Sequence, residues 1–186
     1  MLRIFATFIL FLAITSRSTF AEDEILRRDF GPKISTFWHP ATAQDDRPPN
    51  VTIDTVVLHA TERRFLWQVI EYFERPTAKA SAHFTIDKTG VIAQHVEVEK
   101  RAWHAGISKM KDGRESVNDF SIEIELVNLN DGKDTYPKSQ LEALRELLAE
   151  LKRRYPITSV VLHSEIAIPP GRKTDPMEFN MDWIDN

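Results

Sequence analysis

The 186-residue sequence contains no cysteine and only six glycines. Without cysteine it can form no disulfide, so the folded domain must be held together by its hydrophobic core. The glycines are scattered, which excludes a glycine-rich phosphate-binding loop, and the G-x-S-x-G motif of many serine hydrolases is absent. The sequence also lacks a basic excess, because its formal charge is −4. We therefore expect no nucleic-acid partner.

No hydrophobic run is long enough to span a membrane. The run near the N-terminus, residues 4–14, has eleven residues, whereas a membrane-spanning helix needs about 20. Arg3 precedes the run, and Thr19 and Ala21 supply the small residues of a signal-peptide cleavage site. We therefore expect residues 1–21 to be a signal peptide that is removed. The mature protein is expected to be exported, periplasmic or secreted, and soluble, with an uncleaved N-terminal anchor as the alternative.

The rest of the chain has the pattern of one domain. Residues 22–50 are polar and proline-rich, which predicts an extended N-terminal segment with a short strand near residues 34–38. Residues 51–186 form the expected catalytic domain. Hydrophobic periodicity there predicts strands at 52–60, on both sides of a turn at 87–90, at 119–128 and at 159–163, and helices at 65–75 and 137–154. This order predicts an α/β fold, with a central mixed β-sheet flanked by helices.

The tetrapeptide V-V-L-H occurs twice, at residues 56–59 and 160–163. In each copy a strand-like run leads directly to a histidine, and ligand sites of α/β sheets lie at the carboxyl ends of strands. If the two strands are neighbours, His59 and His163 are close enough to share a metal ion. A hydrolytic zinc site uses three protein ligands. Asp175 is the candidate third ligand, and a turn-forming role before Pro176 is an equal alternative.

Five ordered segments within residues 47–176 resemble the zinc-dependent N-acetylmuramoyl-L-alanine amidases of the type 2 family, which are relatives of the peptidoglycan recognition proteins. The segments are V-V-L-H-A-T, S-A-H-F-T-I-D-K-T-G-V-I-A-Q-H-V, R-A-W-H-A-G, N-D-F-S-I-E-I-E-L-V-N and H-S-E-I-A-I-P-P-G-R-K-T-D-P. The resemblance implies that His59, His163 and Asp175 bind one Zn²⁺. It also implies that the protein hydrolyses the amide bond between N-acetylmuramic acid and L-alanine in peptidoglycan or muropeptides.

The same resemblance places the catalytic glutamate at Glu125 and the catalytic lysine at Lys173. A glutamate there would take a proton from the attacking water and return it to the leaving amine. The lysine, together with zinc, would stabilise the developing oxyanion. Substrate contacts are expected from four residues, for which core packing, turn or surface roles are the alternatives: Trp103, His104, Asn118 and Arg172. His83 is expected to support the sheet beneath the site.

Glu123 departs from the family pattern, which usually has glycine at this position. Residues two apart on a strand share a face and lie roughly 6.6 Å apart, so Glu123 and Glu125 could both lie near the metal. If Glu123 points into the site, repulsion between the carboxylates raises one carboxyl pKa and moves the acid limb of the pH–rate profile upward. The alternative places Glu123 at the rim, in water. An unchanged profile in a Glu123→Gly variant would exclude the first arrangement.

Two other functions remain open at this stage. A non-catalytic peptidoglycan-binding module would hold muropeptides without cutting them, and a metallopeptidase would cut within the stem peptide. The expected partner in each case is peptidoglycan or a muropeptide, and the protein is expected to be a monomer.

Overall fold

The computed structural model describes residues 27–30 and 34–184, and the predicted signal peptide lies outside these residues. Within the described part of the chain, no helix is both long and apolar enough to cross a membrane.

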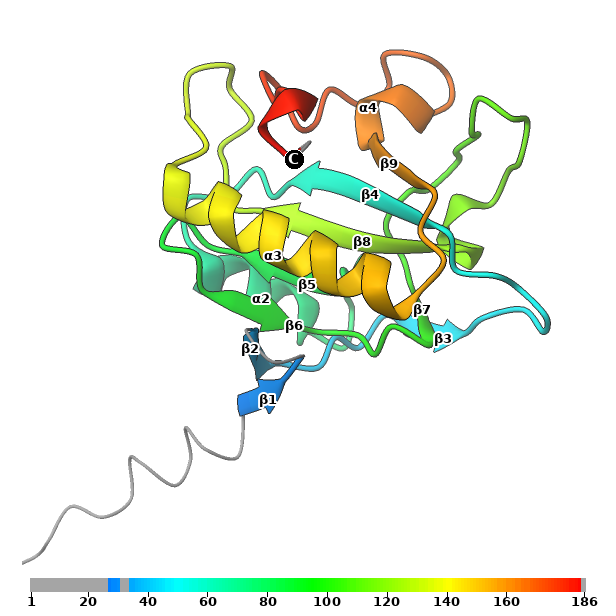
Figure 1. Ribbon diagram of the computed structural model, residues 1–186, viewed down its shortest axis with the longest axis horizontal. Helices are drawn as coiled ribbons and strands as arrows, with labels where there is room; N and C mark the ends of the chain where they lie inside the picture. Colours follow the sequence, from blue (N-terminus) through cyan, green and yellow to red (C-terminus); the bar gives the residue numbers. More distant parts are fainter. Residues whose placement is uncertain (1–26, 31–33, 185–186) are drawn as a thin grey trace, which may run out of the picture.

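A seven-stranded mixed sheet forms the centre of the domain, in the order β1-β2-β6-β5-β8-β4-β9 (Figure 1). Strands β5, β8, β4 and β9 run parallel to one another and β2 runs parallel to β6, whereas β6 is antiparallel to β5 and β1 is antiparallel to β2. The predicted mixed sheet is therefore confirmed. The strands of this sheet are β1 (Arg27–Asp29), β2 (Ser35–Trp38), β4 (Thr55–Ala60), β5 (Phe84–Ile86), β6 (Ile92–Gln94), β8 (Ser121–Leu126) and β9 (Ser159–Leu162).

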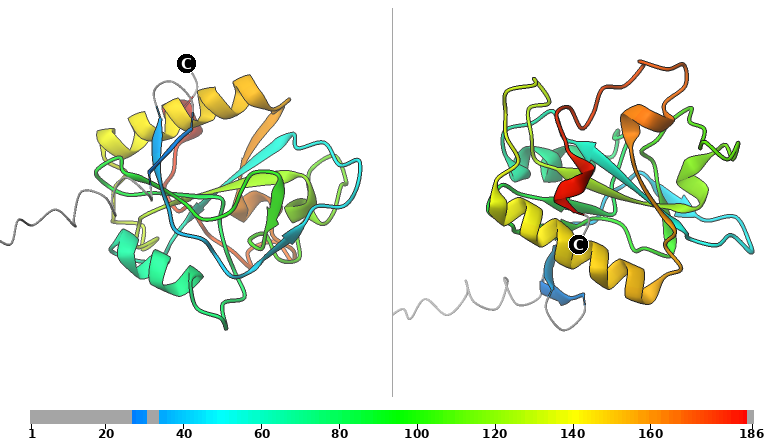
Figure 2. Two further views of the ribbon diagram at one scale, coloured as in Figure 1. Left: turned by 90° about the horizontal axis from the view of Figure 1, so that it is seen from below. Right: turned by 45° about the horizontal axis from the view of Figure 1, so that its top comes forward.

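Two helices cover opposite faces of this sheet (Figure 2). Helix α3 (Lys138–Arg154) buries a leucine stripe that includes Leu144, Leu147 and Leu151 against one face. Helix α2 (Leu66–Phe73) buries Val69 and Phe73 on the other face. Both helices were predicted from their apolar spacing, and α3 ends in three basic residues, as the helix dipole favours. The short helix α4 (His163–Ile166), which directly follows β9, was not predicted.

The neighbouring strands β4 and β8 show why the site lies on the α2 side. All six residues of β4 are buried, as expected for a strand covered on both faces. In β8, Ile122, Ile124 and Leu126 belong to the core beneath α3. Side chains alternate along a strand, so Glu123 and Glu125 project from the opposite face. Acidic side chains are thereby directed into the space between the sheet and α2.

The N-terminal segment contributes strands as well as a covering. The predicted short strand is confirmed as β2, which pairs with β6. A further strand, β3 (Gln44–Asp46), pairs with β7 (Lys100–Ala102) in a separate two-stranded sheet that was not predicted. Arg47 then fastens the segment to the domain, because its guanidinium donates to the carbonyls of Val98, Asn118, Asp119 and Ser121 at 2.8–3.1 Å.

Replacing Arg47 with alanine is expected to lower the free energy of unfolding by roughly 2–4 kcal/mol, because several partly buried carbonyls lose a charged donor. Arg47→Lys should recover only part of this loss, since an ammonium group cannot reproduce the planar fork of donors. Urea unfolding of the two variants tests this. An alanine variant that unfolds at the wild-type midpoint would show that Arg47 contributes little.

Candidate active site

The two V-V-L-H segments lie side by side in the sheet. Strands β4 and β9 are parallel, and the register pairs Val56 with Val160 and Leu58 with Leu162. The next residue of each segment is therefore brought to the same edge of the sheet. The ring centroids of His59 and His163 are 4.2 Å apart. The prediction that these histidines meet is confirmed.

Asp175 completes a group of three buried metal-ligand side chains. It lies in the loop after α4, where its carbonyl accepts a hydrogen bond from the backbone N–H of Ser164 at 2.9 Å. Its Oδ2 lies 3.2 Å from Nδ1 of His59 and 3.0 Å from Nδ1 of His163. The potential ligand atoms of the three residues lie within 4.8 Å of one another. Two imidazole nitrogens and a carboxylate are a donor set that suits zinc.

In both His59 and His163, Nε2 makes a contact away from Asp175, which leaves Nδ1 of each ring for a metal. Nε2 of His59 lies 3.2 Å from Nδ1 of His104, and Nε2 of His163 lies 3.4 Å from the carbonyl of Ala105. The ring of His104 continues this chain, with its Nε2 at 2.9 Å from Oγ of Ser121. Such contacts fix the tautomer and the orientation of metal-ligating histidines. The residues present therefore fit a zinc ion in both donor type and ring orientation.

The protonation states of these groups also suit a cation. Burial lowers the pKa of His59 to about 4, so its imidazole is neutral at pH 7. Burial disfavours the charge of Asp175, but hydrogen bonds to His163 and His59 hold the pKa of that carboxyl well below its usual range. Neutral imidazoles and an ionised carboxylate are the forms that bind metals.

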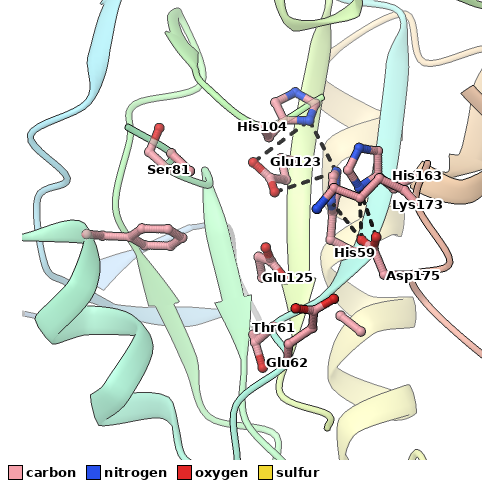
Figure 3. Close-up of a pocket in the computed structure, with 13 residues that line it drawn as sticks. His59, Thr61, Glu62, Ser81, His104, Glu123, Glu125, His163, Lys173 and Asp175 are labelled. Atoms are coloured by element: carbon pink, nitrogen blue, oxygen red, sulfur yellow. Dashed lines mark hydrogen bonds and ion pairs between the residues drawn. The ribbon is translucent and has the colours of Figure 1, made fainter. Parts of the chain in front are cut away.

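Glu123 and Glu125 both lie on the pocket side of β8, and Glu123 contacts His59 and His104 (Figure 3). Glu123 is only 2% exposed and places Oε1 at 3.5 Å from Nε2 of His59, so the alternative of a solvated side chain at the rim is wrong. Glu125 is in register with His59 on the neighbouring strand, and its side chain lines the open pocket beside the ligands. Burial, with the carboxylate of Asp175 adding to it, raises the pKa of Glu125 to about 8. Burial likewise raises the pKa of Glu123, and repulsion by Glu125 is a smaller cause.

The pocket beside the ligands joins residues from several parts of the chain. Lys173 lines it together with Glu125 and the three candidate ligands, which agrees with its expected place near the reacting groups. Sequence reasoning missed the remaining residues, which come from the end of β4 and the loop after it, the end of α2 and the segment before β5. Only Glu62, three positions after a candidate ligand, carried a signal that could have been used. These residues are Ala60, Thr61, Glu62, Phe73, Ala80 and Ser81.

The four expected substrate contacts differ in how well their positions support that role. Trp103 is 39% exposed and lines a neighbouring pocket, so its ring is available to a substrate. The ring of His104 has no exposed surface and contacts His59 and Ser121, which supports a positioning role instead. Asn118 accepts hydrogen bonds from the backbone N–H groups of His104 and Ala105, and Arg172 donates to three backbone carbonyls. For Asn118 and Arg172, the structure therefore supports the alternative turn and surface roles rather than substrate contact.

His83 lies under the site, as expected. Its Nδ1 accepts a hydrogen bond from the backbone N–H of Glu123 at 3.0 Å, so the neutral ring carries its proton on Nε2, facing the carbonyl of Lys100 at 3.2 Å. The guanidinium of Arg47 is also adjacent, at 3.0 Å. Burial, with the charge of Arg47 adding to it, lowers the pKa of His83 to about 3. A second proton, on Nδ1, would break the hydrogen bond that this nitrogen accepts from Glu123 in β8.

Acid is therefore expected to destabilise the fold through His83. Its native pKa is below the ordinary value of about 6.5, so its contribution is complete above pH 6.5 and is lost progressively as the pH falls towards 3. The loss is about 1.4 kcal/mol per pH unit for one such group. Urea unfolding at pH 6, 5 and 4 should show a shallower decline for His83→Gln than for the wild type. Equal slopes would exclude His83 as a source of acid lability.

Comparison with known proteins agrees with this geometry. The sequence profile of the N-acetylmuramoyl-L-alanine amidase family (Amidase_2) matches residues 49–178. The 1,6-anhydro-N-acetylmuramyl-L-alanine amidase AmpD of Citrobacter freundii is 43% identical over 107 residues, which are 56% of this chain and 54% of that protein. AmpD of Escherichia coli K12 gives the same identity over 107 residues, 55% of its length. The match thus spans about half the length of these relatives.

Solved structures show the same fold over more of the chain. The crystal structure of an AmpD derivative superposes with a TM-score of 0.73 and 31% identity, covering 84% of this chain and 96% of the other. AmiD from E. coli, in complex with the substrate anhydro-N-acetylmuramic acid-L-Ala-D-gamma-Glu-L-Lys, gives a TM-score of 0.60 and 28% identity over 70% of this chain and 55% of its own. Because the family profile covers most of the sequence and the sheet carries the predicted ligand set, this chain belongs to the N-acetylmuramoyl-L-alanine amidase family.

Proposed function

We propose that this chain is a zinc-dependent amidase that hydrolyses the bond between N-acetylmuramic acid and L-alanine. The observation that carries the proposal is the meeting of His59, His163 and Asp175 at one edge of the sheet, with Glu125 beside them in an open pocket. A buried set of two imidazoles and one carboxylate is a ligand set that suits a catalytic zinc site.

Zinc held by these residues would supply Lewis-acid chemistry. It would polarise the amide carbonyl, and it would lower the pKa of a water molecule so that this water can attack as hydroxide near neutral pH. Glu125 takes the proton of the attacking water and returns it to the amine that leaves. Its raised pKa suits this exchange, because a carboxylate with the usual low pKa holds a proton poorly. The positive charge of a bound cation favours the ionised form of Glu125 and so partly reverses this rise in its pKa.

Lys173 provides a second positive charge at the pocket. As the carbonyl oxygen becomes negative during attack, a nearby ammonium group stabilises it more in the transition state than in the ground state. Trp103 offers an exposed aromatic face beside the pocket, on which a sugar ring can pack. Glu125 and Lys173 thus act on the reacting bond, whereas Trp103 offers a surface that orients the substrate.

We propose muropeptides as the substrate class, with those that carry a 1,6-anhydro-muramic end as the first to test. The support is the name of the AmpD relatives and the anhydromuramyl peptides bound in the structures of two other relatives, AmiD and AmpDh3 of Pseudomonas aeruginosa. These findings concern the relatives.

Mass spectrometry of defined muropeptides tests the function. Zinc-loaded protein is expected to release a free peptide that begins with L-alanine, whereas chelator-stripped protein should release none. Cleavage within the peptide would identify a metallopeptidase, and binding without cleavage by zinc-loaded protein would identify a recognition module. Either outcome would overturn the proposal.

We further propose that the protein is exported and acts as a monomer. The support for export is the charged, apolar and small-residue pattern of residues 1–21. N-terminal sequencing of protein from the periplasmic or culture fraction should find Glu22 as the first residue, and light scattering should give a monomer mass. Retention of uncleaved chain inside the cell would contradict export.

A further inference from the structure

The side of His59 that faces away from Asp175 meets a second set of metal-ligand atoms. Nε2 of His59 lies 3.2 Å from Nδ1 of His104 and 3.5 Å from Oε1 of Glu123. Nδ1 of His104 lies 3.9 Å from Oε2 of Glu123. Two donors bound to one tetrahedral zinc ion at about 2.1 Å are roughly 3.4 Å apart. The three separations therefore have the size expected around a single zinc ion.

The donor atoms of this set are also prepared for a cation. Because Ser121 Oγ can accept the N–H of His104 Nε2, the lone pair of that ring is left on Nδ1. Glu123 is 2% exposed, and among the described residues its Oε2 has no hydrogen-bond partner. A buried carboxylate oxygen without a partner is costly and calls for a proton or a cation. His104 and Glu123 are also among the residues that line the pocket, so this set of donors lies next to it.

We propose that His59, His104 and Glu123 form a second, weaker zinc site that shares the imidazole of His59 with the first. It rests on the proposed function only in that His59 serves both sites. As the second ion binds, the proton on Nε2 of His59 passes to solvent and a bond from Nε2 to zinc replaces the N–H bond. The ring then bridges the two ions as an imidazolate.

The second ion binds more weakly than the first for two reasons. It must displace the Nε2 proton of His59, and it enters a site already beside a divalent cation. It also has a functional consequence. Its ligand Glu123 lies on the same face of β8 as the proposed catalytic base Glu125, two residues away, so an ion there adds positive charge beside that base. Excess zinc is therefore expected to inhibit turnover.

Zinc stoichiometry tests this without reference to activity. Metal-stripped protein is dialysed against increasing zinc, and bound metal per chain is measured by mass spectrometry. The wild type is expected to bind two ions, one tightly and one at higher zinc. Glu123→Gln and His104→Gln should each bind only the tight one. Glu62→Gln, which neutralises an exposed acid of the same pocket, is the matched control and should bind two.

The outcomes separate this inference from the proposed function. No bound ion in the wild type would overturn the zinc amidase itself. One ion in the wild type at all zinc concentrations would overturn the second site alone. Two ions in both the wild type and Glu123→Gln would place the second ion elsewhere and also overturn it. Support requires two ions in the wild type and in Glu62→Gln, and one ion in the Glu123 and His104 variants.

Discussion

Replacing His163 with alanine is expected to abolish turnover and to leave the protein without tightly bound zinc. The substitution removes one of three ligands and leaves the carboxylate of Asp175 facing only His59. A catalytic zinc site with two protein ligands does not hold its ion well. Metal content after dialysis should fall from near one ion per chain to near none, and muropeptide cleavage should become undetectable.

Two further variants make this result specific. Asp175→Asn keeps the volume of the side chain but removes its charge, and it should also lose zinc and activity. His39→Ala removes a histidine that is partly exposed and paired with Glu74, and it should keep both. A His163→Ala protein that still holds one tightly bound zinc ion per chain after dialysis would contradict the assigned ligand set.

Replacing Glu125 with glutamine is expected to lower kcat by about 10²- to 10⁴-fold, the usual contribution of a general base. The amide of glutamine is nearly the same size as the carboxyl group but cannot take a proton from water. Tightly bound zinc should remain, since Glu125 is not among the three candidate ligands. Measurement of kcat together with zinc content distinguishes loss of the base from loss of the metal.

The control for this variant is Glu62→Gln, which removes a carboxylate from the same pocket without touching the proposed base. Its kcat is expected to stay within a few fold of the wild type. If Glu125→Gln retained full activity while Glu123→Gln lost it, the base would be Glu123 and the assignment taken from the family pattern would be wrong.

The core of the site could be predicted because its signals are local. Each V-V-L-H copy is an apolar strand segment that leads to a histidine, buried in β4 and half-buried in the edge strand β9, and the sheet brings the two copies into register. The alternation of residues 121–126 likewise placed the glutamates on the face opposite the core. Periodicity of this kind depends only on neighbouring residues, so it can be read directly from one sequence.

The rest could not be predicted because it depends on contacts between distant segments. Nothing near Arg47 in the sequence indicates that its guanidinium meets carbonyls some fifty to seventy residues away. The likeness of Trp103 and His104 to a cleft lining gave no sign that one ring is open and the other enclosed. From the sequence, Glu123 could lie either at the rim of the site or in its interior. The contacts of Glu123 with His59 and His104 place it in the interior.

The distance along the chain between the two V-V-L-H strands has a consequence for how the protein folds. Pairing β4 with β9 closes a loop of about a hundred residues, and such pairings form slowly because the entropy of closure is lost before the contacts form. Asp175 follows still later in the sequence, so nearly the whole chain must be synthesised before three donors can assemble. Metal capture is then a late folding event. During refolding, zinc uptake should lag behind the formation of helix α3, whose hydrogen bonds are local.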